Sequence, residues 1–261
     1  MAITDDIALA NALADAAGAA IRPFFRARYE IEDKADASPV TEADRAAELA
    51  IRDILERERP KDGIIGEEYG ATREGAGRQW VLDPIDGTRS FIAGRPIFGT
   101  LIALMQDGWP ILGIIDQPIS GERWVGAMGS TTMFNGKPAR SRPCRALDQA
   151  ILASTGPQYF ADCTGEHFSI LAGQCRDTLW GGDCYNYALL ASGHVDIVVE
   201  TGLKLHDIAA LVPVVEGAGG RMCDWNGDPI TDGSDGRVIA LGDPARLDDV
   251  LEALHHGGHD H

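Results

Sequence analysis

Long apolar runs and basic residues are both scarce in this sequence of 261 residues. No stretch approaches the roughly 20 consecutive apolar residues that a membrane-spanning helix needs, and residues 1–6 lack the basic and apolar segments of a secretory signal. Only 23 lysines and arginines stand against 40 acidic residues, which gives a formal net charge of -17 and disfavours a nucleic-acid partner. We therefore expect a cytoplasmic protein that binds neither membranes nor nucleic acids.

Cysteine is also sparse, with five residues, an odd number, and no Cys-x-x-Cys pair. The pattern predicts reduced structural thiols rather than a disulfide framework, and Cys184 in particular is interpreted as a small packed side chain. The hydrophobic share of 44% is enough for a large core. A chain of this length forms one large domain or two small ones.

The first half of the sequence predicts two helices followed by an antiparallel meander. Apolar residues at spacings of three and four predict a helix from Thr4 to about Arg28, and Thr41 as N-cap predicts a second helix that ends before Pro60. Hairpin turns are expected at Asp107-Gly108 and Asn135-Gly136. The strands expected in this half are 63–66, 80–82, 98–105, 110–115 and 123–127.

The second half alternates strands and helices, which is typical of an α/β layer. A crossing point at 137–143 divides the chain into an N-terminal α+β subdomain, 1–140, and a C-terminal α/β subdomain, 141–261. The histidine-rich tail, 255–261, is expected to be disordered, although it could bind metal adventitiously. The expected strands are 151–154, 177–180 and 195–199, and the expected helices are 166–172, 185–192 and 208–218.

Carboxylates recur where predicted strands and helices begin or end. Magnesium prefers hard oxygen ligands and is often held by a few carboxylates together with a substrate phosphate. A single aspartate in an Asp-Pro or Asp-Gly turn usually only shapes the turn, so each position is weak evidence by itself. The joint pattern is what favours a metal site, and its members are Asp44, Glu67, Glu68, Asp83, Asp86 and Asp207.

Three short segments that contain most of these carboxylates resemble the metal-site motifs of the inositol-monophosphatase superfamily. They are Gly66-Glu67-Glu68, the highly specific Asp-Pro-Ile-Asp-Gly-Thr at 83–88, and Leu-His-Asp-Ile-Ala-Ala at 205–210. The resemblance covers most of the chain, from Pro39 to Gly220. It implies an α/β (α+β) fold built as a layered α/β/α/β/α sandwich, phosphomonoesterase activity on a small-molecule phosphate monoester, and a homodimer.

The resemblance also implies that two or three magnesium ions lie in one site. Gly87 and Thr88 would offer backbone amides to the phosphate, and Asp86 and Asp207 would also border the substrate. The implied metal ligands are Glu67, Asp83, the carbonyl group of Ile85, Asp86 and Asp207.

The implied catalytic residues are Asp44, Thr88 and Glu67. Thr88 and Asp44 would orient the attacking water, whose pKa is lowered by metal coordination. Glu67 would face a further, weaker ion. Lys34 is either a site residue carried by a loop or a solvated lysine paired with its acidic neighbours.

Specificity is expected from the second half of the chain, where residues 180–185 resemble the histidinol-phosphatase branch of the superfamily. Carboxylates at Asp183 and Glu200 would match the ammonium group and the protonatable imidazole of histidinol phosphate. Hydrolysis of this compound is a step in histidine biosynthesis. Asp183 has an alternative interpretation as the N-cap of the helix that follows it. Trp180 and Tyr185 either line a pocket for the imidazole or belong to the core.

Other functions stay open at this point. Inositol 1-phosphate is one alternative substrate, and 3'-phosphoadenosine 5'-phosphate is another, with Arg89 and Arg95 meeting the extra phosphate. A noncatalytic regulatory or scaffold protein can keep the same fold, because a fold does not prove turnover. The full set of carboxylates argues against this last alternative.

Overall fold

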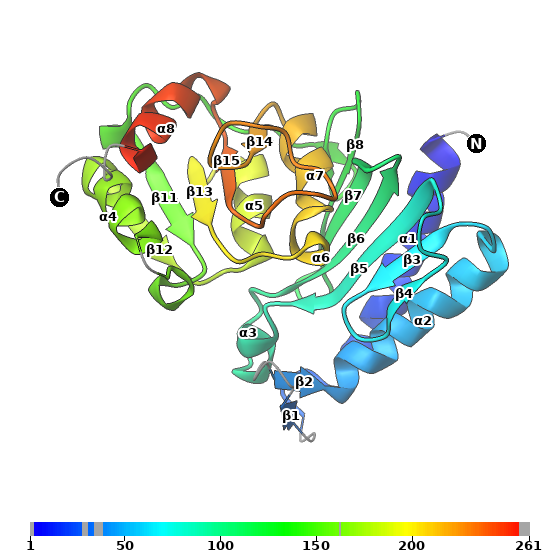
Figure 1. Ribbon diagram of the computed structural model, residues 1–261. Helices are drawn as coiled ribbons and strands as arrows, with labels where there is room; N and C mark the ends of the chain where they lie inside the picture. Colours follow the sequence, from blue (N-terminus) through cyan, green and yellow to red (C-terminus); the bar gives the residue numbers. More distant parts are fainter. Residues whose placement is uncertain (1–2, 28–30, 34–38, 162, 256–261) are drawn as a thin grey trace.

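The computed structural model describes residues 3–27, 31–33, 39–161 and 163–255, and it arranges them in alternating layers of helices and sheets (Figure 1). Two sheets are each covered on their outer face by helices, and further helices lie between them. Three separate groups of buried apolar side chains fill the spaces between these layers. The predicted layered α/β/α/β/α sandwich is therefore confirmed.

The outer helices of the larger sheet are α1 (Ile3–Ile21) and α2 (Glu42–Glu58), which pack on each other and on the sheet. Their apolar stripes bury side chains such as Leu13 and Ile51 against Trp80 and Leu82. The first helix was predicted to reach about Arg28 but ends at Ile21. Pro23 explains the early end, because its ring disfavours helical geometry in the preceding residue.

The larger sheet has the strand order β10-β9-β8-β7-β6-β5-β3-β4. Its strands pair antiparallel except for β3 with β5, and the predicted meander is confirmed to within a few residues at the strand ends. Both predicted hairpin turns are present, since Asp107, Gly108, Asn135 and Gly136 all have positive φ. The strands are β3 (Gly63–Gly66), β4 (Gly70–Thr72), β5 (Arg78–Asp86), β6 (Gly99–Gln106), β7 (Trp109–Gln117), β8 (Glu122–Ala127), β9 (Met133–Phe134) and β10 (Lys137–Pro138).

The smaller sheet has the order β12-β11-β13-β15-β14, with β11 parallel to both β12 and β13. The predicted alternation of strands and helices is confirmed here, although β14 and β15 were not predicted. Helices α4 (Thr164–Gln174) and α8 (Leu247–His255) cover its outer face. The strands are β11 (Ile151–Ser154), β12 (Asp177–Trp180), β13 (Ile197–Glu200), β14 (Arg221–Cys223) and β15 (Val238–Leu241).

Between the sheets lie α5 (Cys184–Ala191), α6 (Leu205–Ile208) and α7 (Leu211–Gly217). The single helix predicted at 208–218 is wrong, because α6 and α7 are separate. Pro213 has no N–H to donate to the carbonyl group of Ala209, which interrupts the helical bonding. Gly113 allows the close approach of this segment to the sheet, since a Cβ atom there would lie 1.9 Å from the Ala210 carbonyl oxygen.

Shorter elements complete the described chain: β1 (Ile31–Asp33) pairs with β2 (Pro39–Thr41), and α3 (Thr88–Ile92) follows β5 directly. Three short 3-10 helices are η1 (Leu147–Gln149), η2 (Pro157–Tyr159) and η3 (Pro244–Arg246). None of the helices in the described ranges has the length and apolarity needed to cross a membrane. Lys34 and the tail beyond His255 lie outside the described residues, and the division of the chain near residue 140 stays a prediction.

Candidate active site

A cavity of about 270 Å³ is lined by residues of β5, α3, β13 and α6. The positions of these four elements can be followed in Figure 1. The cavity is lined from both halves of the chain, since Asp83 comes from β5 and Glu200 from β13. The predicted site residues that line it are Glu67, Asp83, Ile85, Asp86, Gly87, Thr88, Asp183, Glu200 and Asp207. Asp44 does not line it, although this buried carboxylate on α2 is close enough to raise the pKa of Asp83.

The carboxylates of Asp83 and Asp86 reach the same cavity because β5 is irregular between them. This strand was predicted only as far as Leu82 but continues to Asp86. Its register with β6 shifts between Asp83 and Asp86, as at a β-bulge. Such a bulge changes the direction in which the neighbouring side chains point. Thr100 holds the irregular segment by donating its hydroxyl to the carbonyl oxygen of Pro84 at 2.7 Å, and Asp83 accepts the N–H of Ile85 at 3.1 Å.

Two groups of ligand atoms among the described residues are compact enough to hold a metal ion. Asp83, Asp86 and Asp207 form one group, and Glu67, Asp83 and His206 form the other, with the atoms of each group within 4.8 Å of one another. Burial, followed by the charges of Glu67, Asp86 and Asp207, raises the pKa of Asp83 well above its usual range. Carboxylates crowded in this way require protons or cations to neutralise them, so the donor set suits a divalent cation.

Each carboxylate of this cluster is also anchored by a backbone amide or by the loop that carries it. Asp86 accepts the N–H of Cys184, the first residue of α5, at 2.6 Å, and Asp207 accepts the N–H of Lys204 at 2.6 Å. Glu67 is carried by a loop whose N–H group at Glu68 donates to the buried Glu48 at 2.7 Å. The cluster is therefore fixed to three different parts of the fold.

Gly87 is the N-cap residue of α3, and a residue without a side chain is required there for two reasons. Its φ of 86° is left-handed, and a Cβ atom would lie 2.7 Å from the carboxylate oxygen Oδ2 of Asp183. Beside it, the hydroxyl group of Thr88 donates to the carbonyl oxygen of Ile85 at 3.1 Å. Gly87 and Thr88 both line the cavity, and the carboxylate of Asp183 lies directly against Gly87.

Asp183 does not cap α5, so the alternative interpretation of this residue is wrong. It occupies the N-cap position but its side chain makes no capping hydrogen bond, and it accepts the hydroxyl of Ser90 at 3.2 Å instead. The amides that a capping side chain would accept, those of Tyr185 and Asn186, donate instead to the backbone carbonyl groups of Gly182 and Asp183, while Asp86 accepts the amide of Cys184. Burial raises the pKa of Asp183 to about 6, against the opposing effects of the Ser90 hydrogen bond and the charge of Arg95.

Glu200 is enclosed by donors from its own surroundings. Its Oε1 atom accepts the Thr155 N–H at 2.8 Å and also the Thr155 hydroxyl, while Oε2 accepts the Tyr187 hydroxyl at 2.8 Å. Burial nevertheless raises the pKa of Glu200 to about 7. Its negative charge is therefore weaker at neutral pH than that of an ordinary glutamate.

Trp180 and Tyr185, for which a pocket role and a core role were both open, do not line the cavity, and of the two only Tyr185 packs against the core. Trp180 is 44% exposed, and Tyr185 donates its hydroxyl to Glu122 at 2.8 Å. Sequence reasoning missed the residues that do line the cavity: Tyr159, Phe160 and Tyr187, together with the metal candidate His206. His206 had a signal, because it directly precedes Asp207 inside a recognised motif.

With this fold and this cluster of carboxylates, the chain belongs to the inositol monophosphatase family, a family of phosphatases, whose sequence model matches residues 3–257. A solved structure of an inositol monophosphatase from Zymomonas mobilis has a TM-score of 0.90 and 58% identity, over 97% of this chain and 99% of that chain. Curated relatives point to more than one substrate. A histidinol-phosphatase from Chlorobaculum parvum is 39% identical over 86% of this chain and 88% of its own length.

A second curated relative is the bifunctional phosphatase IMPL2 of Arabidopsis thaliana, described as chloroplastic. It is 52% identical over 222 residues, which are 84% of this chain. The match spans only 64% of the Arabidopsis protein's length. Membership of the family therefore does not fix the substrate, because its members carry names with different substrates.

Proposed function

We propose that this protein is a magnesium-dependent phosphatase that hydrolyses L-histidinol phosphate to L-histidinol and phosphate. The observation that carries the proposal is the presence of Asp183 in the cavity, as a carboxylate outside both metal-ligand groups. An ammonium group and a protonatable imidazole gain from a nearby carboxylate, whereas a neutral polyol gains less. Glu200 adds to this acidic lining, with the weaker charge that its raised pKa implies.

The similarity to the Chlorobaculum histidinol-phosphatase supports this substrate. Inositol 1-phosphate is the second candidate, because the Zymomonas structure is named as an inositol monophosphatase and is 58% identical. Histidine biosynthesis, a cytoplasmic location and a homodimer remain predictions that accompany the first proposal.

In the proposed mechanism Glu67, Asp83, the Ile85 carbonyl, Asp86 and Asp207 would hold the magnesium ions. When bound, these ions supply charge neutralisation at the phosphate and lower the pKa of a coordinated water. The backbone amides of Gly87 and Thr88 bind phosphate oxygens. The Thr88 hydroxyl orients the water for in-line attack. Asp44, which does not line the cavity, remains a predicted partner in this step.

The test is phosphate release by the purified protein with magnesium, on histidinol phosphate, inositol 1-phosphate and 3'-phosphoadenosine 5'-phosphate at equal concentrations. We expect kcat/KM for histidinol phosphate to exceed the others by about 100-fold, which corresponds to about 3 kcal/mol. Asp86→Asn is the matched control, since it removes one metal ligand and should abolish turnover without unfolding the protein. A preference for inositol 1-phosphate would overturn the substrate, and no turnover at all would favour the noncatalytic alternative.

A further inference from the structure

His206 is a nitrogen donor at the edge of the carboxylate cluster. It lies in α6, directly before Asp207, and its side chain is 13% exposed. One ring nitrogen is within 4.8 Å of carboxylate oxygens of both Glu67 and Asp83. Two ligands on opposite sides of one metal ion are about 4 Å apart, because each metal-to-ligand bond is about 2 Å long. The three side chains are therefore spaced to share an ion.

The chemistry of this group differs from that of the all-carboxylate group beside it. Carboxylates, carbonyl groups and water suit magnesium, whereas an imidazole ligand favours late first-row metals such as cobalt, nickel and zinc. Asp83 belongs to both groups, so an ion held with His206 would adjoin the ion held by Asp86 and Asp207. The two positions are not chemically equivalent.

We infer that Glu67, Asp83 and His206 form a mixed nitrogen and oxygen site that takes a late first-row divalent cation, such as Co²⁺ or Zn²⁺, in preference to Mg²⁺. The inference rests on the proposed function and refines its metal assignment, because it replaces magnesium with a late first-row metal at the position of Glu67 and Asp83. It gives the protein one position selective for such metals beside one suited to magnesium. Zinc or cobalt would then displace magnesium more readily at the first position than at the all-carboxylate one.

A purely structural role for His206 is the rival explanation. Its Nε2 atom is 3.6 Å from Oδ1 of Asp207, so the ring also contacts a neighbouring carboxylate without any metal. In that case replacing the ring would change the position of Asp207 and weaken all cations alike. A selective loss of cobalt binding separates the two explanations, because only a ligand role predicts it.

The experiment measures Co²⁺ and Mg²⁺ binding to the full-length protein without substrate. Co²⁺ affinity is followed by visible absorption and Mg²⁺ affinity by calorimetry, and the imidazole protons are observed by NMR in the Co²⁺ form. Because the histidine-rich tail can bind Co²⁺, all variants carry His256→Asn, His259→Asn and His261→Asn. His255 is kept, since its ring is hydrogen bonded to the Trp225 carbonyl oxygen at 2.9 Å.

In this background we expect His206→Asn to weaken Co²⁺ binding at least about tenfold and Mg²⁺ binding less than about threefold. Paramagnetically shifted imidazole signals should also disappear. The exposed His194 provides the matched control, and His194→Asn should leave both affinities unchanged. His206→Gln, a second replacement of different length, should behave like His206→Asn.

Equal weakening of Co²⁺ and Mg²⁺, or unchanged Co²⁺ binding with unchanged NMR signals, would overturn the inference. Failure of the proposed function has a different signature. Selective Co²⁺ binding that depends on His206, in a protein that does not hydrolyse histidinol phosphate, would refute the substrate and leave the mixed site in place.

Discussion

At the residue scale, Asp183 lies against Gly87, where the proposed function places the substrate phosphate. Its carboxylate accepts the Ser90 hydroxyl and occupies the space that the missing side chain of Gly87 leaves open. A substrate phosphate held at the start of α3 would therefore bring its organic part near this carboxylate. This placement supports the proposal that Asp183 selects which organic groups are accepted.

Replacing Asp183 with Asn should reduce kcat/KM for histidinol phosphate at least about tenfold, because a charged hydrogen bond contributes about 1.5 to 3 kcal/mol. The effect on inositol 1-phosphate should be smaller, since that substrate has no cationic group. Steady-state kinetics on both substrates measure the difference. The exposed Asp148 serves as the control, and Asp148→Asn should change neither value. An equal loss on both substrates would contradict a role in specificity.

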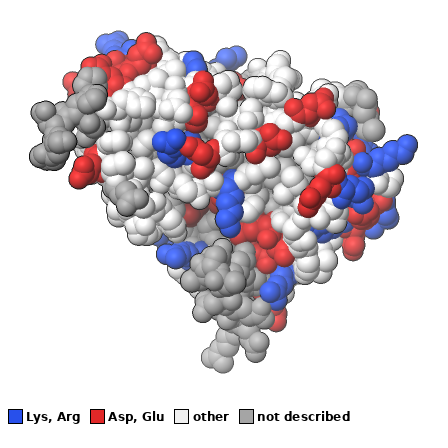
Figure 2. All heavy atoms as spheres, in the orientation of Figure 1, with Lys and Arg blue, Asp and Glu red and all other residues white. Residues whose placement is uncertain are grey.

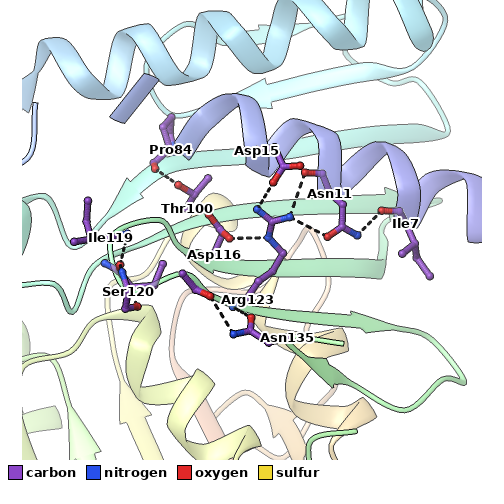
Figure 3. A network of polar contacts seen from close by, with 12 residues as sticks. Ile7, Asn11, Asp15, Pro84, Thr100, Asp116, Ile119, Ser120, Arg123 and Asn135 are labelled. Carbon is purple, nitrogen blue, oxygen red and sulfur yellow. Dashed lines mark hydrogen bonds and ion pairs between the residues drawn. The ribbon is translucent and has the colours of Figure 1, made fainter. Parts of the chain in front are cut away.

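At the scale of elements, one arginine ties α1 to two strands of the larger sheet (Figure 3). Arg123 on β8 donates to Asp116 of β7 at 2.6 Å and to Asp15 of α1 at 2.8 Å, and it also reaches Asn11. Asp116 is only 5% exposed, and burial raises its pKa. This network fixes the outer helix layer against the sheet that carries the site.

Arg123→Met should lower the free energy of unfolding by about 2 to 4 kcal/mol, because it leaves the buried carboxylate of Asp116 without its charged partner. Urea unfolding followed by circular dichroism measures this change. Arg237→Met is the matched control: Arg237 pairs with Asp235 on the surface, with side chains 42% and 49% exposed, and should contribute less than about 1 kcal/mol. Similar losses in the two variants would show that burial of Asp116 does not matter.

Elements set by local chemistry were the ones that the sequence predicted well. The hairpins at Asp107-Gly108 and Asn135-Gly136 follow from residues that tolerate positive φ, and the carboxylate motif at 83–88 is contiguous. The missed or wrong features depend on distant parts of the chain. The alternative interpretation of Asp183 as a cap failed because its carboxylate accepts the hydroxyl of the distant Ser90 instead of an amide of α5. The short strands β14 and β15 are likewise completed by long-range pairing.

At the scale of the whole molecule, the excess of acidic residues extends well beyond the site. Acidic side chains occur across the face shown in Figure 2, and the formal net charge is -17. Inside the cavity several carboxylates are buried. Burial is the first cause that raises the pKa of each of Asp83, Asp86, Asp183 and Glu200. Stability without metal should therefore depend on pH.

The direction follows from proton binding. A carboxylate whose pKa is raised on folding binds more protons in the folded state than in the unfolded state, so it stabilises the fold at low pH and loses this effect as pH rises through the folded value. For Glu200, with a pKa raised from 4.5 to about 7, the window runs from about pH 4.5 to 7. The conversion of about 1.4 kcal/mol per pKa unit limits its share to about 3 kcal/mol.

We therefore expect the metal-free protein to lose unfolding free energy between pH 5 and 8, as measured by urea unfolding in the presence of a chelator. Saturating magnesium should restore stability most strongly at pH 8, because it binds only the folded state and replaces the lost protons. Glu200→Gln should flatten the pH dependence, whereas Glu74→Gln, at an exposed position, should not. A metal-free protein whose stability rises from pH 5 to 8 would show that its carboxylates are stabilised as anions by the fold itself. The cluster would then not need a cation.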